Sequence, residues 1–180
     1  MDEQTLTALL RQVRDGGMQI PEAVDRLRRL EVEVLASARL DHHRALRTGL
    51  PEAVFGENKS ADQLVEILAA LLRTDSVVLA TRVDADKAAA VRARLAGLAY
   101  HPAARILTGN DRHIPVGRAS GTVVIVTAGT SDLPVAEEAR ITLHMFGHPV
   151  ETVYDAGVAG IHRILAHSAL LQQGRVIIVV

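Results

Sequence analysis

The sequence contains no cysteine and no tryptophan, and its 180 residues include only two phenylalanines and two tyrosines. Without cysteine the chain has neither a disulfide framework nor a thiol nucleophile. The scarcity of aromatic residues argues against binding of single-stranded nucleic acid, because that binding usually relies on rings that stack against the bases.

An excess of charge of one sign is also missing. The net charge is -1, and residues 121–180 hold only three of the 20 basic and five of the 21 acidic residues. Neither residues 1–120 nor residues 121–180 are basic enough to predict a DNA or membrane-surface partner. The N-terminus lacks the pattern of a signal peptide, and no apolar run approaches the roughly 20 residues needed to span a bilayer. We therefore expect a cytoplasmic protein with no nucleic-acid or membrane partner.

The sequence does have a high apolar content, 48%, which is enough to bury a core. Residues 1–118 are expected to form a mixed α/β domain. Ser60 is placed to cap one of its helices. Turn residues at 47–49 and 56–58 predict short strands on either side of the first turn. Apolar spacing predicts a helix at 61–72, and the break at 15–17 with Pro21 after it predicts two helices at 5–15 and 21–30. A further helix is expected at 85–95 and strands at 76–83 and 104–109.

Residues 119–180 follow a more regular pattern, in which strands at 122–127, 150–155 and 175–180 alternate with helices at 134–146 and 160–172. This alternation predicts a parallel, doubly wound βαβαβ sheet. The runs 123–126 and 176–180 are apolar without alternation, as expected of strands that are covered on both faces. Because the chain ends on a bare strand, we expect the sheet to be incomplete and the chain to be part of a longer protein.

A small polar turn, Ala128–Asp132, follows the first strand of this sheet. Gly129 would allow a ligand to approach the backbone closely, and Thr130 and Ser131 supply hydroxyl groups. The helix that begins near Asp132 directs unpaired N–H groups at the turn. These features suit a phosphate, although an ordinary helix cap formed by Ser131 or Asp132 explains them equally well.

A second candidate turn, Asp155–Arg163, follows the next strand and includes Gly157. His162 and Arg163 fall in the first turn of a helix, where a positive charge is unfavourable by roughly 0.3–1 kcal/mol. Either Asp155 or a bound phosphate could compensate that charge. Because parallel strands bring their carboxyl ends to one edge of the sheet, both turns are expected to open on the same crevice.

A third group of residues, Arg44, Arg47 and Lys59, lies among the turns of the N-terminal part. These side chains could contact an anion or could belong to a solvated loop. The histidines predict no metal site. His42 and His43 point to opposite sides of an extended segment, and the remaining histidines lack a convincing third ligand.

The segments AGTSDLPVAEEA and YDAGVAGIHR, in this order and spacing, resemble the LarB family, the pyridinium-3,5-biscarboxylic acid mononucleotide synthases of nickel-pincer cofactor biosynthesis. The resemblance extends from RLDHHRALRTGLPEAVFGENKS to the final VIIVV. Residues 119–180 are also similar to the first portion of the flavodoxin-like catalytic domain of PurE-type phosphoribosylaminoimidazole carboxylases. The Gly-Ser-x-Ser-Asp turn of that domain is partly matched by Gly129, Ser131 and Asp132.

The resemblance implies that the substrate is nicotinic acid adenine dinucleotide. In the LarB family its pyridinium ring is carboxylated with carbon dioxide or bicarbonate, and its phosphoanhydride is hydrolysed with release of AMP. Ser131 and Asp132 carry over as phosphate ligands, whereas His162 and Arg163 match less closely because residues 157–161 form an insertion. The resemblance further implies a homo-oligomer, an octamer in the family. The sequence leaves the metal requirement open, with Mg²⁺ as the candidate cofactor.

The catalytic glutamate and cysteine of the family are expected beyond Val180, so the catalytic residues are not identified here. A thiolate that adds to the pyridinium ring would create a carbon nucleophile for carbon dioxide. Residues 1–180, which lack cysteine, are therefore not expected to carboxylate the ring alone. Two other functions remain open: carboxylation of aminoimidazole ribonucleotide in purine biosynthesis, and a non-catalytic, flavodoxin-like nucleotide-binding module.

Overall fold

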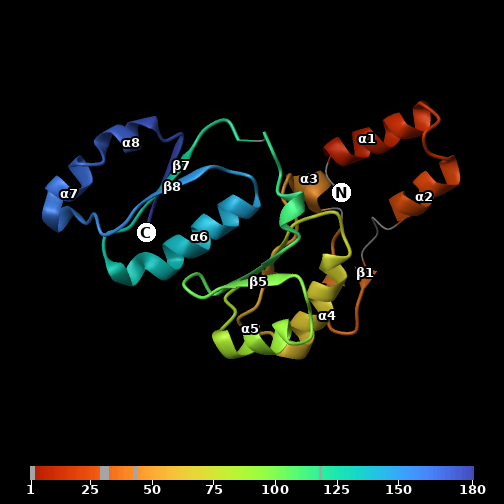
Figure 1. The fold of residues 1–180 in the computed structure, drawn as a ribbon, viewed down its shortest axis with the longest axis horizontal. Coiled ribbons are helices and arrows are strands. Elements are labelled where there is room, and N and C mark those ends of the chain that lie inside the picture. The colour runs from red at the N-terminus through yellow and green to blue at the C-terminus, as the bar shows by residue number, and fades with distance from the viewer. Residues whose placement is uncertain (1–2, 29–32, 43, 118) are drawn as a thin grey trace.

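The computed structural model describes residues 3–28, 33–42, 44–117 and 119–180 (Figure 1). Only the backbone is described for Arg28, Leu46 and Arg47. The described chain contains a four-stranded sheet, a three-stranded sheet and a two-stranded hairpin, with helices between and around them. None of these helices is long and apolar enough to cross a bilayer.

The chain begins with a helical hairpin made of α1 (Glu3–Arg14) and α2 (Ile20–Arg28). Both helices were predicted, as was the break between them at 15–17. They pack on each other through Leu9, Met18 and Ala23, and this small cluster is separate from the larger cores of the chain. Figure 1 shows the hairpin at one end of the molecule.

The four-stranded sheet has the order β3-β4-β6-β5. β3 runs parallel to β4, and the other pairs are antiparallel. Helices α4 and α5 pack on one face of the sheet, against Val78, Ala80 and Leu107. The bounds of these elements are β3 (Val54–Phe55), α4 (Ala61–Leu72), β4 (Val78–Thr81), α5 (Ala85–Arg92), β5 (Leu98–His101) and β6 (Ile106–Gly109).

Helix α4 begins at the predicted cap. The Ser60 side chain accepts a hydrogen bond from the Gln63 N–H at 3.2 Å, and the Gln63 side chain accepts one from the Ser60 N–H at 2.9 Å. These reciprocal bonds satisfy two N–H groups at the start of the helix and fix where it begins. A hairpin of β1 (Glu33–Val34) and β2 (Arg39–Leu40), followed by the short helix α3 (Arg44–Thr48), lies before β3.

The C-terminal sheet has the order β8-β7-β9, and all its strands are parallel. Val124 and Val126 of β7 face the short helices α7 and α8, which contribute Ile164, Leu170 and Leu171. This arrangement confirms the predicted parallel α/β sheet, and its three strands follow the order 2-1-3. Its elements are β7 (Val123–Val126), β8 (Val150–Val153), α7 (Ile161–Leu165), α8 (Ser168–Gln173) and β9 (Val176–Val179).

Helix α6 (Leu133–Met145) lies between the two main sheets (Figure 1). Its residues Ile141 and Met145 pack on Leu79 and Ile106, on the face of the four-stranded sheet opposite α4 and α5. Helix α6 also contacts β7 and β8. The two sheets therefore share one covering helix. The helix itself was predicted at 134–146, but its packing on the four-stranded sheet was not.

The end of α6 is held by a glycine turn. Gly147 has a φ of 81°, its N–H donates to the His144 carbonyl at 2.9 Å, and the His148 N–H donates to the Leu143 carbonyl at 3.0 Å. This is the Schellman arrangement, which needs a residue in the left-handed region. A Cβ on residue 147 would lie 2.2 Å from the carbonyl oxygen of Pro115, so the turn also packs tightly on the connection between the sheets.

Several predicted elements differ from the structure. The single helix expected at 160–172 is wrong, because the chain breaks after Leu165 and forms α7 and α8. The turn expected at 47–49 is the end of helix α3, and strand β5 was not predicted. Strand β9 was expected to be covered on both faces, yet Val176 and Val179 are 50% and 73% exposed. The division at residues 118 and 119 stays a prediction, since Arg118 lies outside the described residues.

Candidate functional site

The turns that follow β7 and β8 lie against each other at one edge of the C-terminal sheet. The Ala156 N–H donates to the Thr127 carbonyl at 2.9 Å, and the Gly157 N–H donates to the Ala128 carbonyl at 3.0 Å. A Cβ on residue 157 would lie 2.8 Å from the Ala128 oxygen, so glycine is needed for this approach. The structure therefore brings the two predicted turns together.

Thr127 is a buried polar residue beneath this pair of turns. Its side chain is fully buried, and its Oγ1 accepts a hydrogen bond from the Asp155 N–H at 3.0 Å. This bond fixes the start of the second turn on the end of β7. Asp155 takes a φ of 54°, a left-handed conformation that aspartate tolerates better than most residues. Sequence reasoning missed Thr127, although a threonine directly after an apolar strand was a usable signal.

The first turn is organised by Asp132. Its Oδ2 accepts a hydrogen bond from the Gly129 N–H at 2.8 Å, and its Oδ1 accepts one from the Ser131 hydroxyl at 3.3 Å. Residues Thr130–Asp132 form a single 3₁₀ turn, and the Asp132 side chain does not cap the following helix α6. The carboxylate therefore holds the turn closed, while the side chains of Thr130 and Ser131 remain exposed to solvent.

Gly129 is not required by the conformation of this turn. Its φ of -143° is one that any residue adopts, and a Cβ there would meet nothing closer than the Asp132 carboxylate at 3.9 Å. Folding therefore leaves open space over the backbone of residue 129. A group that approached from solvent would meet the backbone directly.

The second turn contains the counter-charge for its own arginine. The Arg163 guanidinium lies 3.0 Å from the Asp155 carboxylate, and the side chains are 39% and 56% exposed. The sequence left open whether Asp155 or a bound phosphate compensates the charge of Arg163, and the structure places the Asp155 carboxylate beside it. His162 is exposed in α7. The charge of Arg163 therefore does not by itself require a bound anion.

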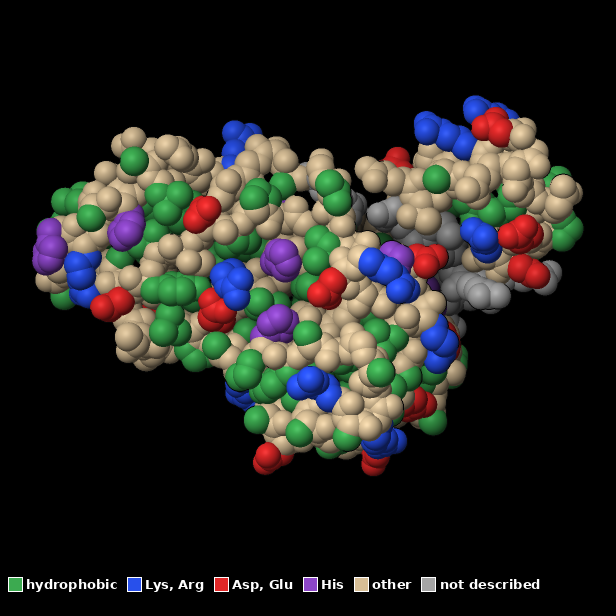
Figure 2. Space-filling view, viewed as in Figure 1, with side chains coloured by type: hydrophobic (Ala, Val, Ile, Leu, Met, Phe, Trp, Pro, Cys, Tyr) green, Lys and Arg blue, Asp and Glu red, His purple; other side chains and the backbone are tan. Residues whose placement is uncertain are grey.

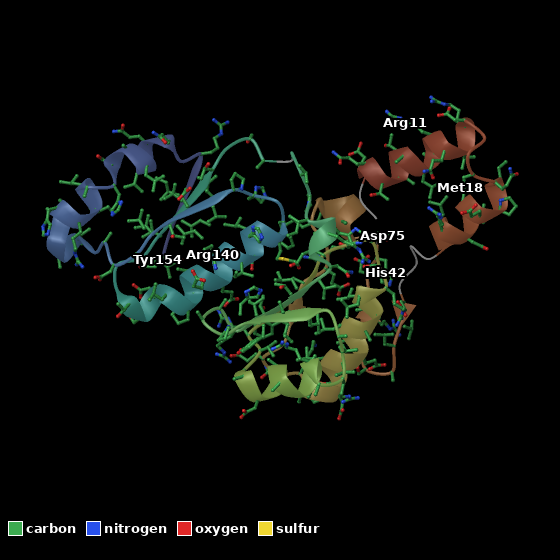
Figure 3. All side chains as sticks on the ribbon, in the orientation of Figure 1. Arg11, Met18, His42, Asp75, Arg140 and Tyr154 are labelled. Carbon is green, nitrogen blue, oxygen red and sulfur yellow. The ribbon has the colours of Figure 1, made fainter. Side chains whose placement is uncertain are left out.

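A polar network that the sequence did not predict flanks the turns. Tyr154, at the end of β8, donates a hydrogen bond to Glu137 of α6, and Arg140 donates two bonds of 2.8 Å to the same carboxylate. Figure 3 shows Tyr154 and Arg140 side by side along α6. The Arg140 hydrogen bonds, helped by Tyr154, lower the pKa of Glu137, and burial raises the pKa of Tyr154. The three-residue spacing of Glu137 and Arg140 was the only signal in the sequence.

Separate polar contacts lie where α6 meets the four-stranded sheet. Glu138 of α6 pairs with Arg82 at 2.6 Å, and His101 of β5 shares a 2.9 Å hydrogen bond with Thr108 of β6. Burial is the main cause that lowers the pKa of His101, and the positive charge of Arg140 lowers it further. The neutral imidazole is thus favoured at the contact between α6 and the sheet.

The third predicted group is not brought to this edge of the sheet. Arg44 is exposed on α3, Lys59 lies just before α4, and the side chain of Arg47 is outside the described residues. In Figure 1, α3 and α4 lie well apart from α7. His43, one of the histidines considered for a metal, is also outside the described residues. Among the described residues, no cluster of three or more histidine or acidic side chains could hold a metal ion.

Positive and negative side chains are interspersed on the face shown in Figure 2. No continuous patch of one sign covers that face. The edge that carries the two turns is marked by its backbone geometry, in particular by the open space at Gly129.

Comparison with known proteins relates the N-terminal part to a family. Residues 32–111 match the family described as LarB/PurE-like N-terminal domain. The chain is also 32% identical over 167 residues to the uncharacterized protein MJ0165 of Methanocaldococcus jannaschii, a match that covers 89% of this chain and 65% of that protein. The chain thus spans just under two thirds of the length of this relative. The family match supports a relationship to carboxylases.

Proposed function

Because residues 32–111 match the family of LarB/PurE-like N-terminal domains, we propose that this chain is part of a LarB-type carboxylase and hydrolase. In this proposal the substrate is nicotinic acid adenine dinucleotide, the pyridinium ring is carboxylated with carbon dioxide or bicarbonate, and AMP is released by hydrolysis of the phosphoanhydride. The location is cytoplasmic, the assembly is a homo-oligomer, and Mg²⁺ is an optional cofactor.

One observation carries the proposal for the site: the turns after β7 and β8 are hydrogen-bonded to each other beside an open backbone at Gly129. Exposed hydroxyls of Thr130 and Ser131 lie next to that backbone, and the start of helix α6 follows them. Backbone N–H groups and hydroxyls at the start of a helix suit a phosphate. In this proposal Thr130 and Ser131 hold the phosphate and so orient the substrate, and the Ser131 hydroxyl, which donates to Asp132 in the free chain, turns to the phosphate when it binds.

The charge balance of the second turn sets the role of Arg163. Since Arg163 is paired with Asp155, it would bind the phosphate as a shared partner rather than as an isolated cation. The partial exposure of both side chains leaves the guanidinium able to turn toward a ligand. Gly157, which allows the turns to meet, keeps this pair close to the first turn.

A binding experiment tests the proposal. Nicotinic acid adenine dinucleotide, aminoimidazole ribonucleotide and FMN would be titrated calorimetrically against the 180-residue chain. We expect nicotinic acid adenine dinucleotide to bind best. Ser131→Ala should weaken its binding by about tenfold, because one hydrogen bond to a charged group is lost. Ser120→Ala is the matched control, because Ser120 lies before the amino end of β7 and Ser131 lies beyond its carboxyl end.

The other outcomes assign the chain differently. Preferential binding of aminoimidazole ribonucleotide would favour the carboxylase of purine biosynthesis, which shares the Ser-Asp turn. Tight binding of FMN alone would favour a non-catalytic nucleotide module. Equal losses with Ser131→Ala and Ser120→Ala would remove the turn from the binding site.

Residues 1–180 contain no cysteine, so they cannot form the thiolate adduct that the LarB reaction uses. We expect no carboxylated pyridinium product when this chain alone is incubated with substrate and ¹³C-labelled bicarbonate. Mass spectrometry of the nucleotide pool measures this directly. A labelled product would refute the assignment of the thiolate step to residues outside this chain.

A further inference from the structure

A hollow remote from the turns after β7 and β8 lies beside β3 in the N-terminal part. Its volume is about 420 Å³, which falls within the usual range for small-molecule sites. Residues of the β1–β2 hairpin form one wall, and β3 with the following turn forms the other. In Figure 1, β1 and α4 lie on the opposite side of the molecule from α7.

The floor of this hollow is apolar and its rim is polar. Leu40, Val54 and Ile67 line it and are almost fully buried, while the ring of Phe55 is 52% exposed. The polar side chains that line it are Ser37, Arg39, Glu52, Asn58 and Lys59. An apolar base with a few polar groups around it is the usual composition of a ligand pocket.

The two cations on the rim are available to a ligand. Within the described part of the chain, the side chains of Arg39, Asn58 and Lys59 make no hydrogen bond or ion pair. Glu52, the one carboxylate in the lining, accepts a hydrogen bond from the Asp41 N–H at 2.8 Å. The hollow thus has two cations that pair with no carboxylate among the described residues, beside exposed Phe55, and Glu52 balances one of the two charges.

Both walls are held in place before any ligand binds. On one side, the carboxylate of Glu66 in α4 accepts hydrogen bonds from the Ala36 N–H at 2.7 Å and from the Ser37 hydroxyl. These bonds lower the pKa of Glu66, the Ser37 bond being the larger cause. On the other side, the Lys87 ammonium donates to the carbonyls of Gly56 and Glu57 at 3.1 and 3.0 Å. A pocket with fixed walls loses little freedom on binding, which favours affinity.

We propose that this hollow binds a nucleoside monophosphate, with the phosphate held by Arg39 and Lys59 and the base packed against Phe55. Guanidinium and ammonium groups are the usual partners of phosphate, and a planar base suits an exposed aromatic ring. Basic residues beside an edge strand also deter strand pairing. However, β3 is only two residues long and offers little edge to guard or to extend with a peptide. The proposal stands independently of the function assigned to the turns after β7 and β8.

Nuclear magnetic resonance of the ¹⁵N-labelled chain tests this site with AMP, adenosine and inorganic phosphate as separate ligands. We expect AMP to cause saturable shifts at residues 37–40 and 53–59, with adenosine and phosphate each binding at least tenfold more weakly. Arg39→Ala and Lys59→Ala should each weaken the binding of AMP by about tenfold. Phe55→Leu, which keeps an apolar side chain, should abolish the advantage of AMP over inorganic phosphate.

Arg11→Ala is the matched control, because it removes the same charge from the exposed surface of α1. Equal losses with Arg11→Ala and Lys59→Ala would overturn the proposal, as would adenosine binding as tightly as AMP. Shifts confined to residues 128–132 and 155–163 would assign AMP to the other site and overturn this one. Lys59→Gln, checked by circular dichroism, keeps the test valid if Lys59→Ala fails to fold.

Discussion

The two main sheets differ in how completely they are covered. The four-stranded sheet has α4 and α5 on one face and α6 on the other, and both β4 and β6 are almost wholly buried. In the three-stranded sheet β7 is buried, but most of β9 is exposed, and α7 and α8 have no fully buried residue. Similar apolar strands therefore differ in environment, because burial depends on neighbouring elements and not on the strand alone.

Two isoleucines, one in an inner strand and one in an outer strand, offer the sharpest test of this comparison. Ile106 in β6 is 0% exposed, whereas Ile177 in β9 is 47% exposed. Ile106→Ala should lower the free energy of unfolding by roughly 2–5 kcal/mol, because it leaves a cavity. Ile177→Ala should cost less than about 1 kcal/mol, since a half-exposed side chain loses less burial. Urea denaturation measures both.

A large loss with Ile177→Ala would contradict the comparison. It would mean that β9 is covered in solution, for instance by a second copy of the chain. Repeating the denaturation at several protein concentrations separates the cases, because only an associated strand gives a stability that depends on concentration.

The second prediction concerns the glycine turn at the end of α6, which packs on the connection between the sheets. Gly147→Ala should destabilise the chain by roughly 2–4 kcal/mol, because it adds strain at positive φ to a clash with the Pro115 carbonyl. Gly117→Ala is the control: its φ of 73° is similar, but a Cβ there would meet nothing within 4 Å. It should cost only the strain, about 1–2 kcal/mol. Equal shifts in Tm would show that the contact with Pro115 contributes nothing.

The third prediction compares the two glycines of the candidate phosphate site. Gly157→Ala should cost about 1–3 kcal/mol, because its Cβ would lie 2.8 Å from the Ala128 carbonyl. Gly129→Ala should leave thermal stability nearly unchanged. It should instead weaken binding of the nucleotide, since the added methyl group fills the open space over the backbone. Calorimetric unfolding and ligand titration on the same samples check both parts. Unchanged affinity in Gly129→Ala would argue against close approach of a ligand there.

Much of the fold was predictable because local signals agreed with the tertiary packing. The Ser60 cap and the apolar spacing of Leu64, Ile67 and Leu68 fixed α4, and the alternation of strands and helices after residue 121 fixed the parallel sheet. Both turns of the candidate site were also evident, because small polar residues follow apolar strands directly. These features depend on short stretches of sequence.

The remaining features depend on contacts between distant residues. Nothing near Leu165 breaks the helical pattern, so the division into α7 and α8 could not be foreseen. Strand β5 is short, and its sequence Leu-Ala-Tyr-His has little alternation. The bond from Tyr154 to Glu137 joins β8 to α6 across 17 positions, and it was invisible in the sequence. For the same reason the shared role of α6 could not be predicted.

The smallest expected effect concerns the pH dependence of the contact between α6 and the four-stranded sheet. His101 has a lowered pKa and faces Arg140, His144, Glu137 and Asp111. A histidine with a depressed pKa binds fewer protons in the folded state, so stability falls as the pH drops below the usual histidine value of 6.5. Between pH 7.5 and 5.5 the native chain should therefore lose more stability than His101→Gln. Equal losses in both would show that other groups cause the dependence, and Glu137, whose lowered pKa acts only near or below 4.5, would not be among them.

Helix α6 has a mechanical consequence for any ligand held at the turn before it. Its 13 residues make a rod of about 20 Å, which starts at the Asp132 turn and ends at Gly147 against Pro115. A close-packed rod cannot tilt at its first turn without moving Ile141 and Met145 on the neighbouring sheet. Binding of a ligand at the Asp132 turn would thus alter the packing of the four-stranded sheet. Amide-exchange rates would change in its strands, although they do not contact the ligand.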